Sequence, residues 1–151
     1  MMNKKLGYIL CLIYAINAWS CGSSESDESS EGCNDMTAEC LFDRPAVQTD
    51  HYQLKLIALS PNPPERGENT WRIQIHAQAT QEPLEGCGID LIPFMPEHGH
   101  GSPKTPELSE LGGGEYEFSD IVFTMPGLWS MEFSMTCADL AAEQALIDFT
   151  L

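Results

Sequence analysis

The sequence predicts an all-β protein, an immunoglobulin-like β-sandwich of about seven strands. Three observations predict this class. Apolar and polar residues alternate with a period of two in several segments after residue 50. Clusters of Pro, Gly, Asn and Ser interrupt these segments at short intervals, as turns between strands do. Only the stretch 138–143 has helical character, and it is long enough for one turn.

Each expected strand has one apolar face. The residues expected to face the core are, in chain order, Leu54, Leu56 and Ala58, then Trp71, Ile73, Ile75 and Ala77, then Cys87, Ile89, Leu91, Pro93 and Met95, then Tyr116, Phe118, Ile121 and Phe123, then Trp129, Met131, Phe133, Met135 and Cys137, and finally Ala145, Ile147, Phe149 and Leu151. The change of phase near Ser119 and Asp120 predicts a β-bulge. Six or seven short strands in about a hundred residues are typical of an immunoglobulin-like sandwich.

The N-terminal residues 1–20 are typical of a signal peptide. A positive start is followed by the apolar run 6–16, which is too short to span a bilayer. Small residues then precede Cys21, in a pattern that resembles the lipobox of bacterial lipoproteins. We therefore expect an exported protein of the bacterial cell envelope, membrane-anchored through a lipid on Cys21 and facing the periplasm or the exterior. Cleavage by ordinary signal peptidase after Ser20 is the alternative.

Residues 21–49 are interpreted as an acidic tether rich in Ser and Glu. The segment 22–32 contains no apolar residue, so it cannot bury surface to offset the entropy of ordering it. A small disulfide loop is expected at the end of the tether, and the folded domain then occupies residues 50–151.

The charge of the chain excludes nucleic acid as a partner. There are 23 acidic and 7 basic residues, which gives a net charge of −16. Proteins that bind phosphate backbones carry clusters of Lys and Arg, and this chain has none.

The cysteines predict two disulfide bonds in an oxidising compartment. One of the six lies in the signal peptide and Cys21 is the lipid site, which leaves four. Three pairings of these four are open. We favour Cys33–Cys40 as a local loop and Cys87–Cys137 as a buried bridge, because Cys87 and Cys137 lie on expected core faces. The alternative is that any of the four is a free thiol or a metal ligand, but no Cys-x-x-Cys spacing supports a zinc ribbon or a redox site.

The segment from Met95 to Gly101 has the most specific ligand chemistry in the chain. His98 and His100 are separated by one glycine, and Met95 precedes them. Met125 begins a second Met-Pro corner, so a site of Met95, His98, His100 and Met125 would form if the two corners were neighbours. Thioether and imidazole groups suit copper, above all Cu(I). The alternative is that both methionines plug the core at strand ends and the histidines are ordinary loop residues.

Catalysis is not expected. The sequence contains no nucleophile elbow, no paired His-Glu helix motif and no Ser, His and Asp in a recognisable context. We therefore expect that the protein is not an enzyme.

Five short motifs resemble those of a known family. They are Gly67-x-Asn69-x-Trp71, Pro83-Leu84-x-Gly86, Phe94-Met-Pro-Glu-His-Gly-His-Gly101, Gly113-Gly114-x-Tyr116 and Phe123-Thr-Met-Pro-Gly-Leu-Trp129. Together they resemble the YtkA-like domain, which is grouped with the FixH-like proteins, over residues 50–151. The resemblance implies an exported or membrane-attached sandwich domain. It also implies a link to copper, because FixH-like relatives are associated with copper supply to respiratory oxidases, although this chain has a lipobox where FixH proteins have a membrane helix.

Two functions follow from these observations. The first is a lipid-anchored, periplasmic or envelope β-sandwich that binds copper through its Met/His loop, as a carrier or accessory factor. The second is a metal-free module of the cell envelope that binds a protein partner. Loss of metal binding on replacing both loop histidines would separate the two.

Overall fold

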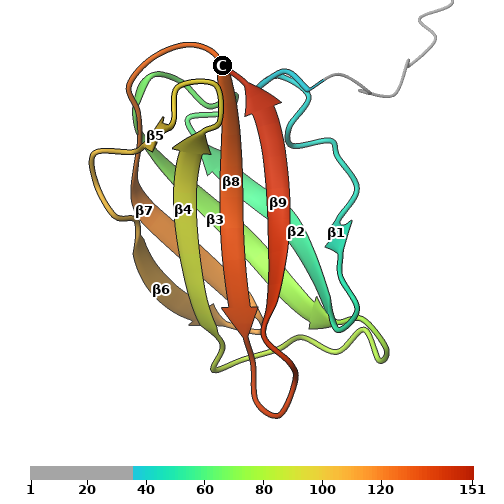
Figure 1. Cartoon of the computed structure of the whole chain (residues 1–151). Coiled ribbons are helices and arrows are strands. Elements are labelled where there is room, and N and C mark those ends of the chain that lie inside the picture. Colours follow the sequence, from blue (N-terminus) through green and yellow to red (C-terminus); the bar gives the residue numbers. More distant parts are fainter. Residues whose placement is uncertain (1–35) are drawn as a thin grey trace, which may run out of the picture. The chain divides into compact units, whose positions relative to one another are not determined.

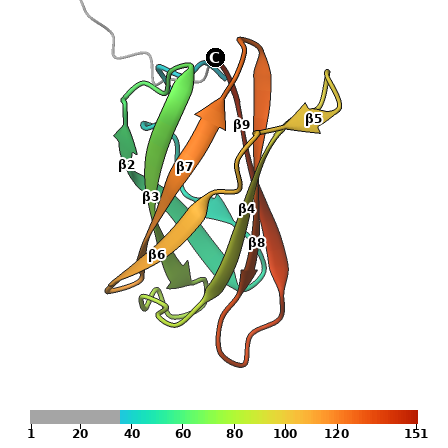
Figure 2. The same cartoon turned by 90° about the vertical axis from the view of Figure 1, so that its left-hand side faces the viewer.

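Residues 36–151 are described by a computed structural model and form two antiparallel β-sheets that pack face to face. The two layers are seen edge-on in Figure 2. Within these residues no segment forms a helix, and the stretch 138–143, where one turn was expected, is a loop that leads into a strand. No helix in this part of the chain could therefore cross a membrane.

The larger sheet has the strand order β1-β2-β3-β7-β6 (Figure 1). Its strands are β1 (Val47–Gln48), β2 (Tyr52–Ser60), β3 (Gly67–Ala77), β7 (Glu115–Phe123) and β6 (Glu107–Gly112). The smaller sheet has the order β5-β4-β8-β9. Its strands are β5 (His100–Gly101), β4 (Gly88–Met95), β8 (Leu128–Thr136) and β9 (Glu143–Thr150).

The topology confirms the predicted fold class. Of the nine strands in residues 36–151, β1 and β5 have two residues each, and the other seven have six or more. Those seven form sheets of order β2-β3-β7-β6 and β4-β8-β9, which is the ABED and CFG arrangement of a constant-type immunoglobulin sandwich. The strand missing from the sequence prediction is β6, because all six of its residues are exposed and it has no apolar face.

Most of the core consists of the apolar faces that the alternation predicted. In β2 the prediction fails after Leu56, because a bulge turns Leu59 into the core and leaves Ala58 half-buried, and Ala77 and Leu151 are also only half-buried. The largest fully buried side chains of the core include Trp71, Trp129, Tyr52, Tyr116, Phe118, Phe123, Phe133 and Phe149. Phe123 lies at the centre of an aromatic cluster, with its ring centroid 4.9 Å from that of Trp129 and 5.4 Å from that of Phe149. Such tilted and edge-on pairs stabilise a core beyond the burial of their area, by about 0.5–1.5 kcal/mol each.

The bulge predicted in β7 is confirmed. Trp71 pairs with Phe118 and Asn69 pairs with Ile121, so two residues of β7 stand opposite one of β3. Asp120 adopts a positive φ of 58° at this point. The bulge restores the inward direction of Ile121 after Phe118, which explains why both residues are buried although they are an odd number of positions apart.

Residues 36–49, which the sequence analysis assigned to the tether, contribute to the folded part of the chain. Leu41 is fully buried and Ala38 is nearly so. Thr37 pairs in parallel with Thr150, which extends the smaller sheet beyond β9. Cys40 is disulfide-bonded. The predictions for the signal peptide, for Cys21 and for Cys33 fall on residues outside the described part.

Candidate metal centre

Met95 is the last residue of β4, and the chain reverses directly after it. The backbone N–H groups of His98 and Gly99 both donate to the Met95 carbonyl, at 3.1 and 2.9 Å. These bonds close a tight hairpin that returns the chain as β5. His100 then stands directly opposite Met95 in the antiparallel pair of β5 and β4.

The two histidines of the hairpin lie beside each other. Both are exposed, and their ring centroids are 5.8 Å apart with the ring planes inclined by 37°. A ring nitrogen binds a metal such as zinc at about 2.0–2.1 Å, so two imidazoles that share one ion have centroids at most about 6.4 Å apart. The observed separation is therefore within the range that one ion can bridge.

His100 also shares a sheet face with Met95. Directly opposed residues of an antiparallel pair have side chains on the same face, with Cβ atoms about 4.5–5.5 Å apart. Met95 is fully buried, whereas His100 is exposed at the edge of the sheet. The pair therefore combines an interior thioether with an imidazole that solvent reaches.

The second Met-Pro corner lies against the first. A Cβ on Gly127 would come within 3.1 Å of the Met95 Cε atom, so the tip of the Met95 side chain rests on this corner. The corner itself is held in place by hydrogen bonds. The Trp129 indole donates to the Met125 carbonyl at 3.1 Å, and Gly127 exchanges two backbone hydrogen bonds with Leu151, at 3.1 and 3.0 Å.

The structure thus brings the two corners together, which was the condition for the predicted site. His98 contacts His100, His100 is paired with Met95, and Met95 touches the corner that begins with the half-buried Met125. Among residues 36–151 no group of three or more His, Cys, Asp or Glu side chains could hold a metal. A metal centre at this end would therefore depend on the thioethers as well as the imidazoles.

Lys104 anchors the segment that leaves the hairpin, and the sequence analysis did not identify it. Its ammonium group donates to Glu68 Oε1 on β3 and to Asp120 Oδ1 on the β7 bulge, both at 2.8 Å. These two bonds raise the pKa of Lys104. The predicted bulge at Asp120 is the signal that could have suggested a partner for this lysine.

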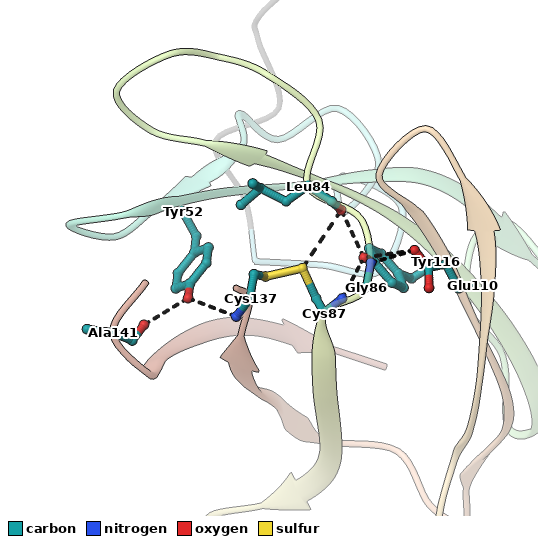
Figure 3. Close-up of a disulfide and its surroundings, with 8 residues drawn as sticks. All are labelled: Tyr52, Leu84, Gly86, Cys87, Glu110, Tyr116, Cys137 and Ala141. Carbon is teal, nitrogen blue, oxygen red and sulfur yellow. Dashed lines mark hydrogen bonds between the residues drawn. A yellow bond between two sulfur atoms is a disulfide. The ribbon is translucent and has the colours of Figure 1, made fainter. Parts of the chain in front are cut away.

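The opposite end of the sandwich contains the disulfide that the sequence analysis favoured, between Cys87 and Cys137. It joins neighbouring strands of one sheet, because Cys87 precedes β4 and Cys137 follows β8 (Figure 3). Two tyrosine hydroxyls flank it. The Cys87 N–H donates to Tyr116 Oη at 3.1 Å, and the Cys137 N–H donates to Tyr52 Oη at 3.2 Å.

Each tyrosine hydroxyl also donates a hydrogen bond. Tyr116 donates to the Leu84 carbonyl and Tyr52 to the Ala141 carbonyl, both at 2.8 Å. Burial raises the pKa of Tyr116, so its hydroxyl keeps the proton that this bond needs. Because the two sulfurs are bonded to each other, neither is a metal ligand. The cysteines instead fix the loops at this end.

Comparisons with known proteins agree with the family resemblance and with the β-sandwich fold. A family model described as YtkA-like matches residues 46–134. No curated protein sequence matches. A crystal structure of a DUF4426 family protein from Pseudomonas aeruginosa PAO1 has a TM-score of 0.54 at 7% identity, covering 72% of this chain and 96% of the other.

Two further similar structures are of FetP from uropathogenic Escherichia coli. The protein as isolated has a TM-score of 0.50 at 11% identity, covering 72% of this chain and 95% of FetP. A copper-bound variant of FetP has a TM-score of 0.49 at 10% identity, covering 70% of this chain and 88% of that one. At these identities the similarity shows a shared fold.

Proposed function

The chain belongs to the YtkA-like family, and from that premise we propose that it is an exported protein of the bacterial cell envelope that binds copper. The proposed site is the Met/His end of the sandwich, formed by Met95, His98, His100 and Met125. The role that fits such a site is that of a copper carrier or accessory factor.

The contact of Met95 with the second Met-Pro corner is the observation that carries this proposal. Together with the neighbouring rings of His98 and His100 and the register of His100 opposite Met95, it supports a shared site for the residues of the two corners. Soft thioether sulfur prefers Cu(I), and imidazole accepts Cu(I), Cu(II) and zinc. A set that combines both groups therefore favours copper over zinc.

The location in the envelope rests on the sequence and on the disulfides. A signal peptide followed by Cys21 in a lipobox-like context would deliver the domain to the outside of the inner membrane and anchor it there. The Cys87–Cys137 bond suits an oxidising compartment. The acidic tether would hold the sandwich away from an anionic membrane surface.

We propose a binding role and not catalysis. The groups with a perturbed pKa in the described part of the chain are His51, Lys104, Tyr116 and Glu143, and each takes part in an ion pair or hydrogen bond that ties structural segments together. None of the four lies among the proposed copper ligands.

A Cu(I) titration of the mature protein in competition with a chromogenic chelator tests the proposal. We expect one equivalent of Cu(I) to bind, and binding to be lost in the double variant His98→Ala, His100→Ala. The matched control is His51→Ala, His76→Ala, which removes the same number of imidazoles from elsewhere and should bind as the parent does. A folded parent protein that takes no Cu(I) from the chelator would refute the proposal, and so would equal losses in the two double variants.

The role of the thioether can be tested separately with Met125→Leu. This change keeps the apolar volume and removes the sulfur, so we expect weaker Cu(I) binding with little change in Cu(II) binding by the histidines. Equal effects on both oxidation states would argue against Met125 as a ligand.

A metal-free interaction module of the envelope is the second candidate. It is favoured by Ile92 and Leu146, which are 55% and 56% exposed. Both are paired in register with Glu132 of β8, so they share the outer face of the smaller sheet. In this case a protein partner should co-purify equally well with the parent and with the His98→Ala, His100→Ala variant.

A further inference from the structure

Strand β4 has a full partner on one side only. Gly88 to Phe94 pair with β8 throughout their length, whereas β5 pairs only with Phe94 and Met95 on the other side. Figure 2 shows β5 at one end of β4, after which the chain crosses to β6 in the other sheet. Pro103 and Pro106 lie in this crossing, and neither has an N–H with which to continue the pairing. The first half of β4 is therefore an open sheet edge.

The open edge presents unpaired backbone groups. The Ser102 N–H donates to the Pro93 carbonyl at 3.1 Å, so this carbonyl points to the side of β5. Backbone groups of alternate residues point to the same side of a strand, so the N–H and C=O groups of Leu91 and Ile89 also face the open edge. Within residues 36–151 no strand or side chain bonds to them there. These four groups match one side of an antiparallel ladder.

A hollow lies next to this edge. Its volume is about 140 Å³, and it is lined by Leu91, Ile92 and Pro93 of β4 and by the crossing segment, including Thr105 and Pro106. Ile92 is 55% exposed beside it. An apolar side chain of an added strand that points to the same face as Leu91 could fill the hollow.

The charges around the edge define which strand fits. Asp90 is exposed on the outer face, and Glu132 is paired with Ile92 on that face. The one cation at the hollow, Lys104, is already bonded to Glu68 and Asp120. Two copies of this chain paired along β4 with Ile89 opposite Leu91 would bring their Asp90 carboxylates together, which disfavours a dimer in this register. A strand with Lys or Arg opposite Asp90 is instead favoured.

We propose that the open edge of β4 binds an extended segment of a partner protein, which adds to the smaller sheet as an antiparallel strand with alternating apolar and basic residues. Main-chain hydrogen bonds to Ile89 and Leu91 hold the strand, the hollow takes one apolar side chain, and Asp90 selects a basic one. This surface is separate from the four proposed copper ligands and does not depend on metal binding.

A synthetic peptide of alternating Lys and Val, eight residues long, tests the proposal on the isotope-labelled mature protein. Binding is followed by NMR chemical shifts and by hydrogen exchange of individual amides. We expect the amides of Ile89 and Leu91 to become protected. A peptide of the same sequence with alternate backbone nitrogens methylated keeps the side chains but loses the donors, and it should not bind.

Charge reversal at Asp90 tests the selection of a basic strand. Asp90→Lys should weaken binding of the Lys peptide by about tenfold and improve binding of the corresponding Glu peptide. The control Asp139→Lys makes the same charge change at an exposed loop residue and should leave binding unchanged.

Three outcomes would overturn the proposal. They are failure of the Lys peptide to bind at millimolar concentration, equal binding of the methylated peptide, and protection of Ile89 and Leu91 through self-association of the protein without peptide. Because the copper titration uses other residues, it can succeed or fail independently of these results.

Discussion

The two ends of the sandwich are built differently. At one end Cys87 and Cys137 are joined covalently, and two tyrosine hydroxyls bond to the backbone on both sides of them. At the other end Met95 rests against Gly127 through van der Waals contact, and two histidines stand exposed in a hairpin. The first end fixes the strands, and the second end carries the groups with ligand chemistry.

The difference bears on how a small domain would hold an exposed site of the kind proposed. Strands β4 and β8 both run from the disulfide end to the Met/His end. The disulfide therefore fixes the relative position of the two strands at both ends. A site placed on rigid strands is held more precisely than one on free loops.

Removal of the disulfide should have the largest effect on stability. The bridge closes a loop with a sequence separation of 50 residues, and the loss of such a cross-link costs about 4 kcal/mol in the free energy of unfolding. We expect this loss in Cys87→Ala, Cys137→Ala by urea denaturation.

The matched change at the other end is His98→Ala, His100→Ala in the absence of metal. Both histidines are exposed, so we expect a change within about 0.5 kcal/mol for each. Comparable losses in the two double variants would mean that the ends do not differ as described.

Replacement of the tyrosine hydroxyls should have the next largest effect. Tyr116→Phe removes the acceptor of the Cys87 N–H and the donor to the Leu84 carbonyl, and leaves a buried N–H and a half-buried carbonyl without these partners. We expect a loss of about 1–3 kcal/mol in the free energy of unfolding. Tyr52→Phe removes the equivalent pair at Cys137 and Ala141 and should cost a similar amount. Losses below about 0.5 kcal/mol in both variants would show that the hydroxyls do not brace the disulfide.

Much of this architecture could be predicted from the sequence. The apolar alternation is strong wherever one strand face is buried, so β3, β4 and β8 were placed within a few residues. Strand β6 was missed because Glu107, Leu108 and Glu110 are all exposed at a sheet edge and leave no periodic signal. The full burial of Leu41 leaves no periodic signal, because the short apolar group Cys40-Leu41-Phe42 after an acidic segment suggests packing at the edge of the domain but has no period.

The residues of the proposed site could be named from the sequence, but the contacts between them could not. The Met-Pro corners and the His-Gly-His spacing are visible in the sequence, whereas their proximity depends on the connection of β7 to β8. The roles of Tyr52 and Tyr116 could not be inferred, because a tyrosine on a core face gives no indication of where its hydroxyl points. Long-range side-chain pairs of this kind are fixed by tertiary structure.

Gly127→Ala should have a smaller effect on stability and a specific effect on the metal site. Gly127 has a φ of 133°, and an added Cβ would lie 3.1 Å from Met95 Cε. We expect a loss of about 1 kcal/mol or more from backbone strain, together with a shift of the thioether that changes Cu(I) affinity. Calorimetry and the chelator competition measure the two effects.

Gly113→Ala is the control for backbone strain. Gly113 also has a positive φ, of 63°, but nothing lies within 4 Å of its Cβ position. It should lose stability and keep its Cu(I) affinity. If both variants keep the parent affinity, the contact between Met95 and the second corner does not shape the site.

The ion pair of His51 and Glu143 should give the smallest effect, and one that depends on pH. The His51 side chain and backbone N–H both bond to this carboxylate at the disulfide end. The bond from His51 lowers the pKa of Glu143 from 4.5 to about 2, and the same bond raises the pKa of His51 above 6.5. His51 is exposed and Glu143 is half-buried at the surface, so solvent screens the interaction.

The sign of the pH dependence follows from these two directions. The lowered pKa of Glu143 stabilises the fold above pH 4.5, and this contribution is lost as the pH falls towards 2. The raised pKa of His51 stabilises the fold below pH 6.5, and this contribution is lost as the pH rises through the folded value. The stability difference between the parent and His51→Gln should therefore be largest between pH 4.5 and 6.5 and smaller at about pH 3 and pH 8.5. His76→Gln, which removes a histidine outside any ion pair of residues 36–151, should show no such maximum. A difference for His51→Gln that stays constant with pH would mean that the disulfide end is held without this pair.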